Sequence, residues 1–420
     1  MQRFPGDPRV RRWHYQLALV ALGPWLAWDA WRRCRRAPLG QRRCFEQFGR
    51  LRNGLPSGGV WLHAVSLGET RAAALLVREM QARWPAVPIV FSTTTETGAD
   101  AARALGLPHF YAPYDYALAQ RRVLNRLRPR AVVVMETELW PNLVRESAHA
   151  GVPVMIANAR LSDRSLARYR RWGGRLLREV FAGIDLICAQ SSDDRERFVE
   201  LGARHVLDCG NLKFDLAVAE RAAPIAPEQA RTWLAASTHP GEEEQVLAAH
   251  ARIRETYPDA RLVLVPRHPE RAAEVMRLVE SSGQSVARWP AGPRRPSVEV
   301  IDRAGVLAAR FSEVPVVFMG GSLVPVGGHN PLEPAAVGRA VLRGPHVQNF
   351  RAVFATLSAA DGERQVADAE ALAAAVIDCF DAPAAWEAAG ERARAAIAAH
   401  RGAARQVAAR MAPWLESAGR

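Results

Sequence analysis

Short apolar runs alternate with amphipathic stretches along this 420-residue chain, and that alternation limits the possible folds more than any other feature. Continuous Val/Ile/Leu runs separated by helical stretches are typical of a parallel sheet that is covered on both faces. The first half therefore predicts a doubly wound α/β domain. Its expected strands are residues 60–65, 88–93, 131–135, 152–157 and 184–189, with helices such as 70–84 and 96–105 between them.

The same pattern restarts after Ala222–Pro227, a proline- and alanine-rich segment that is typical of a linker. Expected strands follow at 232–237, 261–266, 298–301, 315–319 and 340–342, with helices at 242–257 and 270–281 and a helical region at 383–415. We predict two Rossmann-like domains facing a cleft: residues 1–36 as a membrane anchor with basic flanks, 37–221 as the first domain and 222–420 as the second. Ligands of such sheets bind in the loops after the strands.

The chain carries a net charge of +13, which indicates an anionic partner: nucleic acid, a phosphorylated substrate or an anionic membrane. Residues 15–31 are apolar, rich in tryptophan and flanked by arginines, which suits a membrane interface. Pro24, Asp29 and the short apolar run fall below the requirement of about 20 residues for a full span. We predict an anchor that spans the membrane or lies on it, the alternative being a buried core helix. Because no stacking-aromatic or basic-repeat module is present, nucleic acid is not an expected partner.

Four candidate side chains of the first domain lie in loops: three follow expected strands, and Lys213 follows the short apolar run Val206-Leu207. Glu69 is either the capping partner of Ser66 or a general base. Glu136, two residues before a second carboxylate, belongs either to a metal pair or to salt bridges, and Arg160 either binds an anion or forms a surface ion pair. Lys213 is the only lysine among the 56 Lys and Arg residues. Either it survived by chance, or its site needs a compact ammonium rather than a planar guanidinium.

The second domain has two candidate loops. Arg267 and His268 follow an expected strand, where they would face an anion, although His268 could equally be an ordinary loop residue. The glycine-rich stretch 320–334 leads into a helix that should begin near Pro331. Its backbone N–H groups could approach a phosphate closely, with Glu333 accepting from ribose hydroxyls; a purely structural turn is the alternative. No phosphate-binding loop of the GxxxxGK[ST] type is present.

Seven motifs in order, HAVSLGET, METELWPNL, NARLS, GNLKFD, STHPGEE, PRHPER and GGSLVPVGGHNPLEPA, resemble the 3-deoxy-D-manno-octulosonic acid (Kdo) transferases of lipopolysaccharide biosynthesis. The resemblance extends from the N-terminus to about residue 350. It implies a GT-B fold and an inverting, metal-independent transfer of Kdo from CMP-Kdo to lipid IV-A, with no cofactor. It also implies a place at the cytoplasmic face of the cell inner membrane, in contact with its lipids.

The resemblance assigns roles by position. Glu69 would be the general base, while Glu136 and Lys213 would stabilise the transition state. The residues implied to bind the donor are Pro266, Arg267, Ala304, Gly305, Val306, Asn330, Pro331, Leu332 and Glu333. One departure affects this set, since the expected pattern is close to GDTMGEL whereas residues 301–307 read IDRAGVL. Arg303 replaces the threonine and Val306 the glutamate, so only backbone contacts to CMP could persist there.

Two other classes remain open from the residues alone. One is a different GT-B enzyme at the membrane, either a sugar-nucleotide transferase or an epimerase. The other is a basic membrane or nucleic-acid protein without enzymatic activity, which the charge of +13 suggests.

Overall fold

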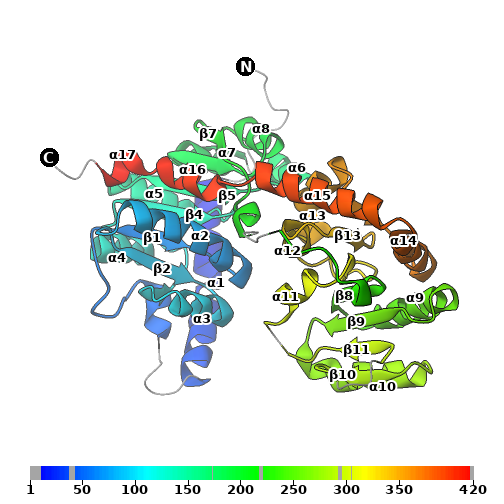
Figure 1. Ribbon diagram of the computed structural model, residues 1–420. Coiled ribbons are helices and arrows are strands. Elements are labelled where there is room, and N and C mark those ends of the chain that lie inside the picture. The colour runs from blue at the N-terminus through cyan, green and yellow to red at the C-terminus, as the bar shows by residue number, and fades with distance from the viewer. Residues whose placement is uncertain are drawn as a thin grey trace. The chain divides into compact units, whose positions relative to one another are not determined.

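The computed structural model describes residues 11–36, 43–172, 174–216, 221–291, 296–303 and 305–416. The chain divides into two compact units, Met1–Asp215 with Gly402–Arg420, and Leu216–Arg401. Each unit contains one sheet with helices on its faces (Figure 1). Every strand pairing in both sheets is parallel. The predicted pair of doubly wound α/β domains is confirmed.

The first sheet has seven strands in the order β3-β2-β1-β4-β5-β6-β7. Its strands are β1 Val60–His63, β2 Ile89–Thr93, β3 His109–Tyr111, β4 Ala131–Met135, β5 Val154–Ala159, β6 Leu186–Ala189 and β7 Val206–Asp208. Its helices are α2 Leu67–Arg83, α3 Glu96–Ala104, α4 Ala117–Leu127, α5 Pro141–His149, α6 Asp163–Trp172, α7 Gly174–Ala182 and α8 Ser192–Glu200, and a 3-10 turn η2 covers Cys44–Phe48.

Alternate residues of the central strands supply two separate cores in this unit. Val132 and Val134 of β4 belong to one core, which α4, α5, α7 and α8 complete. Val133 and Met135 belong to the other, which α2 and α3 cover. Because successive strand side chains point to opposite faces, both faces must be apolar. That requirement explains why these strands were visible in the sequence as unbroken apolar runs.

The second sheet also has seven strands, in the order β10-β11-β9-β8-β12-β13-β14. Its strands are β8 Thr232–Thr238, β9 Arg261–Pro266, β10 Val286–Arg288, β11 Val298–Val300, β12 Val316–Met319, β13 Ala340–Arg343 and β14 Glu363–Gln365. Its helices are α9 Glu243–Thr256, α10 Ala272–Ser281, α11 Leu307–Phe311, α12 Leu332–Ala336, α13 Arg351–Ala359, α14 Ala369–Asp381 and α15 Pro383–Ala399. Short 3-10 turns lie at η4 Pro227–Gln229, η5 Pro269–Arg271 and η6 Gln348–Phe350.

The strands that were not predicted are the four edge strands, β3, β7, β10 and β14. Each has three residues. An edge strand pairs on one side only and is often kept short and polar, so it leaves no continuous apolar run in the sequence. The inner strands agree with the predicted ranges to within about two residues at each end.

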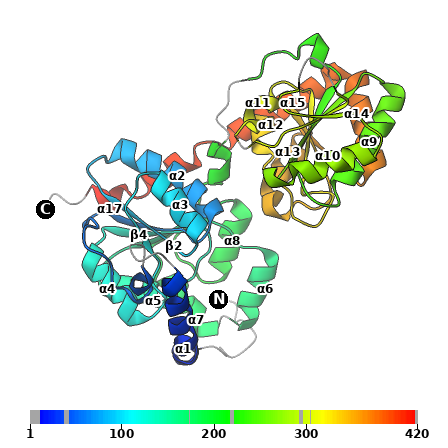
Figure 2. The ribbon, with the colours of Figure 1, turned by 90° about the horizontal axis from the view of Figure 1, so that it is seen from below.

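The N-terminal helix α1, Arg12–Arg36, is attached to the first unit by polar contacts. The Tyr15 hydroxyl donates to the Asp115 carboxylate at 2.8 Å, and the Gln16 amide donates to the Asn142 side chain at 2.7 Å. The Tyr116 hydroxyl donates to the Leu19 carbonyl. Figure 2 shows α1 beside α5 and α7. No helix in the described part of the chain is long and apolar enough to cross a membrane.

The last helices belong to the first unit, although the prediction assigned residues 222–420 to one domain. Helices α16 Ala403–Ala409 and α17 Ala412–Leu415 add Val407, Leu415 and other apolar side chains to the core beneath α2, as does Met411 between them. Figure 1 shows both helices, in red, along this unit. The Asp215 carboxylate accepts hydrogen bonds from the amides of Gly402 at 2.6 Å and Ala404 at 2.7 Å. Asp215, the last residue before the inserted unit, thereby caps α16, the first helix after it.

We expect Asp215→Ala to loosen α16, because two amides in its first turn lose their acceptor. The loss of a capping side chain costs about 0.5–2 kcal/mol. Hydrogen exchange of residues 403–409 should speed up accordingly. Asp368→Ala is the matched control, since Asp368 caps α14 through the Ala371 amide at 2.9 Å in the other unit. Equal exchange of α16 in wild type and Asp215→Ala would contradict the capping role.

Candidate active site

Each sheet has a point where its strand order reverses beside its first strand in the chain, and the motif-bearing loops follow the strands at that point. In the first unit the reversal lies between β1 and β4, which pair directly. In the second it lies between β8 and β12. Parallel strands end at the same edge, and ligands of doubly wound sheets bind at this switch point. The topology therefore brings the SLGET loop beside the ETELW loop, and the STHPGEE loop beside the glycine-rich loop.

Glu69 occupies the first turn of α2 and is 9% exposed. Its carboxylate accepts from the Val65 amide at 2.7 Å and the Ser66 hydroxyl at 2.9 Å, while Ser66 Oγ accepts from the Glu69 amide at 3.4 Å. The capping interaction is therefore confirmed. Burial nevertheless raises the pKa of Glu69 to about 7; the two hydrogen bonds oppose this rise, and nearby Glu136 and Glu138 add to it. The same carboxylate both caps the helix and titrates near neutral pH.

The carboxylates after β4 sit on an unusual backbone. Glu136 has φ of 54°, in the left-handed region that costs a non-glycine residue energy. Its amide remains bound to the Ala157 carbonyl at 2.8 Å, so the turn is part of the sheet edge. Burial raises the pKa of Glu138, whose carboxylate accepts from the Trp140 indole at 3.4 Å. Three carboxyl groups are thus concentrated at the β1/β4 switch point.

Hydrogen bonds connect this turn to the loop of Lys213. The Thr137 hydroxyl accepts from the Arg160 amide at 3.1 Å, joining the loops after β4 and β5. Asn158 also has a left-handed backbone, with φ of 58°, and its side-chain oxygen accepts from the Leu212 amide at 3.0 Å. Lys213 follows in the 3-10 turn η3, Leu212–Leu216. Two hydrogen bonds, joined by the backbone from Asn158 to Arg160, therefore connect the loops that carry Glu136 and Lys213.

A buried histidine that the sequence did not single out lies in the same unit. His63 ends β1, contacts Ser92 Oγ through Nδ1 at 2.9 Å and packs edge-on against the Trp140 ring. Burial lowers the pKa of His63 to about 4, so its imidazole is neutral at pH 7. Its Nε2 is buried without a partner among the described residues. The sequence could not have indicated that this nitrogen is buried without a partner, because its burial depends on how β1 and the start of α5 pack together.

The glycine-rich loop of the second unit holds a carboxylate of the protein itself. Glu242 is fully buried and accepts from the amides of Gly321 at 2.6 Å, Ser322 at 3.0 Å and Leu323 at 2.9 Å. The expectation that these amides cradle a phosphate is wrong, because Glu242 already satisfies them. A side chain at position 320 would approach Glu242 to 2.8 Å, which explains the glycine there.

The predicted donor-binding residues differ in exposure: some are exposed or half-buried, and the others are buried. Arg267 is exposed, and its amide donates to the Thr238 carbonyl at 3.0 Å, which holds the end of β9 beside the end of β8. The Asn330 amide nitrogen donates to the Glu333 carboxylate at 3.2 Å, at the start of α12. Gly305, which is exposed, and Val306, which is half-buried, precede α11, whereas Pro266, Pro331 and Leu332 are buried. Ala304 lies outside the described residues.

The structure accounts for Arg303, which departs from the expected pattern. Its guanidinium lies 5.5 Å from the centre of the Trp289 ring, and Arg310 lies 5.2 Å from the same ring. Asp302 pairs with Arg288 at 3.2 Å. Trp289 thus attracts Arg303 through its ring face. Within the described ranges, no three His, Cys, Asp or Glu side chains are arranged to hold a metal ion.

Known proteins resemble the whole chain. The family model of 3-deoxy-D-manno-octulosonic-acid transferases (kdotransferases) matches residues 42–216. A 3-deoxy-D-manno-octulosonic acid transferase of Bordetella pertussis is 36% identical, covering 96% of this chain and 99% of the relative. That of Haemophilus influenzae is 35% identical, covering 91% and 93%.

Solved structures share the fold at low identity. A glycosyltransferase of Rickettsia africae ESF-5 is 11% identical with a TM-score of 0.56, covering 86% of this chain and 100% of that one. A UDP-GlcNAc 2-epimerase of Neisseria meningitidis is 14% identical with a TM-score of 0.56, covering 85% and 99%. These likenesses support the GT-B fold alone. The sequence relatives decide the family: the chain belongs to the 3-deoxy-D-manno-octulosonic acid transferases and is a glycosyltransferase.

Proposed function

We propose that this enzyme transfers Kdo from CMP-Kdo to lipid IV-A by inverting, metal-independent glycosyl transfer in lipopolysaccharide biosynthesis. The observation that carries the proposal is the Glu69 carboxylate at the β1/β4 switch point, whose pKa is raised to about 7. A general base is most effective when its pKa lies near the working pH. The motif resemblance and the sequence relatives support Kdo as the transferred sugar.

In the proposed reaction an acceptor hydroxyl attacks the anomeric carbon of Kdo while Glu69 accepts the hydroxyl proton. The bond between the anomeric carbon and the phosphate oxygen breaks, and its electron pair leaves with CMP. Glu136 stabilises positive charge that develops on the sugar, and the Lys213 ammonium stabilises negative charge. Oriented charges of this kind cost little reorganisation, because the hydrogen bonds through Thr137 and Asn158 already position both loops.

The second unit would bind the donor through Pro266, Arg267, Gly305, Val306 and the segment from Asn330 to Glu333. The Arg267 guanidinium suits a phosphate, since its planar fork donates two parallel hydrogen bonds. Pro266, Pro331 and Leu332, being buried, would contribute through their backbone only. Val306 cannot supply a carboxylate, so its part in donor binding is likewise limited to the backbone.

We expect Glu69→Gln to lower kcat for CMP release by about 10²–10⁴-fold, the usual contribution of a general base. The assay supplies CMP-Kdo and lipid IV-A together, and each alone as a blank. Because the base acts only when deprotonated, wild-type kcat should fall as pH drops through about 7. The residual activity of Glu69→Gln should not show this fall of kcat at acidic pH. Near wild-type activity in this variant would reject the base assignment.

The capping role of Glu69 needs its own control. Ser66→Ala removes the cap but keeps the carboxylate, so it should cost stability of about 1 kcal/mol with most of kcat retained at high pH. The Ser66 hydrogen bond lowers the pKa of Glu69, so its loss should move the pH limb upward. A large loss of kcat at every pH in both variants would indicate a structural effect.

We expect Lys213→Arg to lose activity by about tenfold or more, although the charge is kept, because a transition-state contact commonly supplies over about 1.4 kcal/mol. Lys213 is half-buried in the turn η3, and a planar guanidinium would not reproduce the compact charge of its ammonium. The measurement is kcat for CMP release, with Arg204→Lys on the surface as the reverse control. Full activity of Lys213→Arg would show that the single lysine is accidental.

We further propose that α1 lies on the cytoplasmic face of the cell inner membrane. The face of α1 that includes Tyr15, Leu19 and Ala30 packs on the protein. The opposite side exposes large apolar side chains, namely Trp13, Leu17, Val20, Leu22, Trp25, Trp28 and Trp31, each at least half exposed. Helices of this kind bury their apolar face at the boundary between lipid headgroups and acyl chains.

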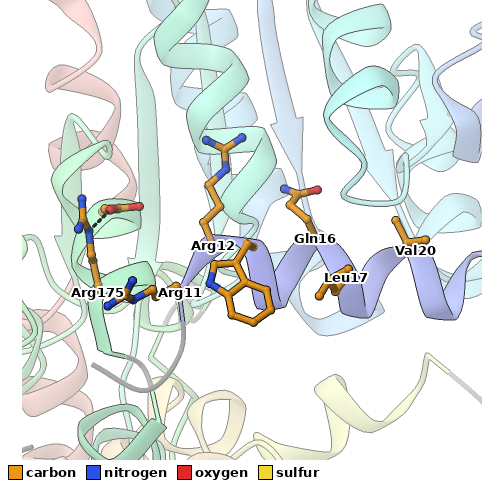
Figure 3. A pocket seen from close by; sticks show the side chains of 8 residues that line it. Arg11, Arg12, Gln16, Leu17, Val20 and Arg175 are labelled. Carbon is orange, nitrogen blue, oxygen red and sulfur yellow. Dashed lines mark hydrogen bonds and ion pairs between the residues drawn. The ribbon is translucent and has the colours of Figure 1, made fainter. Parts of the chain in front are cut away.

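A cavity of about 700 Å³ at the start of α1 combines the two features that an anionic lipid needs. Its lining includes Arg11, Arg12 and Arg175 together with apolar Leu17 and Val20. Figure 3 shows the Arg11 side chain reaching toward Arg175, while Leu17 points away from the side of Arg12 and Gln16. Arg175 is paired with Glu179 at 2.7 Å. These charges support binding to phosphate headgroups next to the apolar face.

We expect the double variant Trp25→Glu/Trp28→Glu to co-sediment at least tenfold less with phosphatidylglycerol vesicles. Each large side chain withdrawn from the apolar phase forfeits about 1.5–3 kcal/mol. Val199→Glu, which changes a residue of α8 that is 50% exposed, is the matched control and should bind as wild type. Unchanged binding of the double variant would exclude this face of α1 as the membrane contact.

A further inference from the structure

Two histidines meet at the switch point of the second sheet. His239 directly follows β8, and His329 lies in the loop after β12. Their Nε2 atoms are 2.7 Å apart, and the two rings are nearly parallel, with an interplanar angle of 5°. This distance is that of a hydrogen bond, so a proton lies between the two Nε2 atoms.

The shared proton determines what the two remaining nitrogens offer. A neutral imidazole carries one N–H, so the ring that donates through Nε2 has a bare Nδ1, and the other ring has an Nδ1–H. The neutral pair therefore presents one donor and one acceptor. One added proton gives two Nδ1–H donors and a positive charge. Among the described residues, neither Nδ1 has a recorded hydrogen-bond partner, and both side chains are half-buried.

The surroundings keep the pair neutral in the absence of a ligand. Burial lowers the pKa of His329 to about 4, with further contributions from His239, Arg267 and His268. Burial also lowers the pKa of His239; His268, Arg267 and Arg271 act in the same direction, and Glu243 acts in the opposite one. Glu243 is paired with Arg271 at 2.9 Å, and Glu242 is held by backbone amides. Arg267, which no ion pair within the described residues neutralises, therefore opposes protonation of the pair, while Glu242 accepts from the His239 amide at 3.3 Å.

The glycine-rich loop leaves room for the two rings. Gly321 has φ of 67°, and a side chain there would approach His329 Cδ2 to 3.0 Å and His239 Cδ2 to 3.4 Å. Arg267 and His268 extend from the adjacent strand end, with the His268 ring 6.0 Å from the His239 ring. The imidazole pair thus lies near Arg267 at the edge where doubly wound sheets bind their ligands.

We propose that His239 and His329 form the subsite for the phosphate of CMP, the nucleotide that departs from the donor, and take up one proton when that phosphate binds. The inference rests on the proposed function, because it assumes a cytidine nucleotide in the second unit. A phosphate dianion needs donors and positive charge, and the protonated pair supplies both. The proton comes from solvent, and no covalent bond changes. Three amides of the glycine-rich loop already donate to Glu242, so the two histidines donate to the phosphate in their place.

The test is calorimetric titration of the full chain with CMP at pH 7.5, in two buffers of different ionisation enthalpy. At this pH free CMP is a dianion, since the second pKa of a phosphate monoester is about 6. We expect the two apparent enthalpies to differ by an amount that corresponds to about one proton taken up per CMP. Cytidine, which lacks the phosphate, should bind without proton uptake.

We expect His239→Gln and His329→Gln each to lose the proton uptake and to bind CMP about tenfold or more weakly, with cytidine affinity within twofold of wild type. His149→Gln, at the exposed end of α5, is the matched control and should bind as wild type. Wild-type CMP binding without proton uptake, or full CMP affinity in both variants, would overturn the inference and leave the proposed function standing. Failure of wild type to bind CMP at all would instead overturn the donor assignment itself.

Discussion

Parallel pairing of β1 with β4, and of β8 with β12, is the constraint on which both candidate sites depend. Each pair joins strands that are distant in the chain and aligns their carboxyl ends at one edge. The loops that follow must then begin as neighbours, whatever their sequences. Left-handed backbone occurs at Glu136, directly after β4, and at Asn158 and Ser237, where the register of the sheet shifts near the ends of β5 and β8.

Two buried glutamates at these edges show how neighbouring donors decide the use of a carboxylate. Glu242 accepts hydrogen bonds from three consecutive loop amides, so its carboxylate serves to hold the loop. Glu69 accepts from one amide and one hydroxyl and has two further carboxylates nearby. Fewer donors and more negative charge make its anion less stable, which leaves it able to bind a proton near neutral pH. Both glutamates are buried, so burial alone does not explain why one holds a loop and the other can bind a proton.

Patterns of neighbouring residues in the sequence predicted most of the fold but only part of the two candidate sites. Inner strands such as β4 and β9 were predicted to the residue because both of their faces are apolar. The Ser66–Glu69 cap followed from a spacing of three residues. Edge strands such as β14 lack that pattern, and the contact between Glu242 and Gly321 joins residues 79 positions apart. No local spacing encodes such a pairing, so the phosphate-cradle prediction failed where a distant side chain occupied the loop.

The capping of α16 by Asp215 has a consequence for how the chain is synthesised. The ribosome releases the N-terminal part first, yet the core under α2 stays open until Val407 and Met411 have emerged. The second unit, Leu216–Arg401, is complete before that moment and can fold as an insertion. Asp215 lies in the same turn as Lys213, so this turn gains its final support only after Gly402 and Ala404 have been synthesised. This part of the first unit is therefore completed only after the whole second unit has been synthesised.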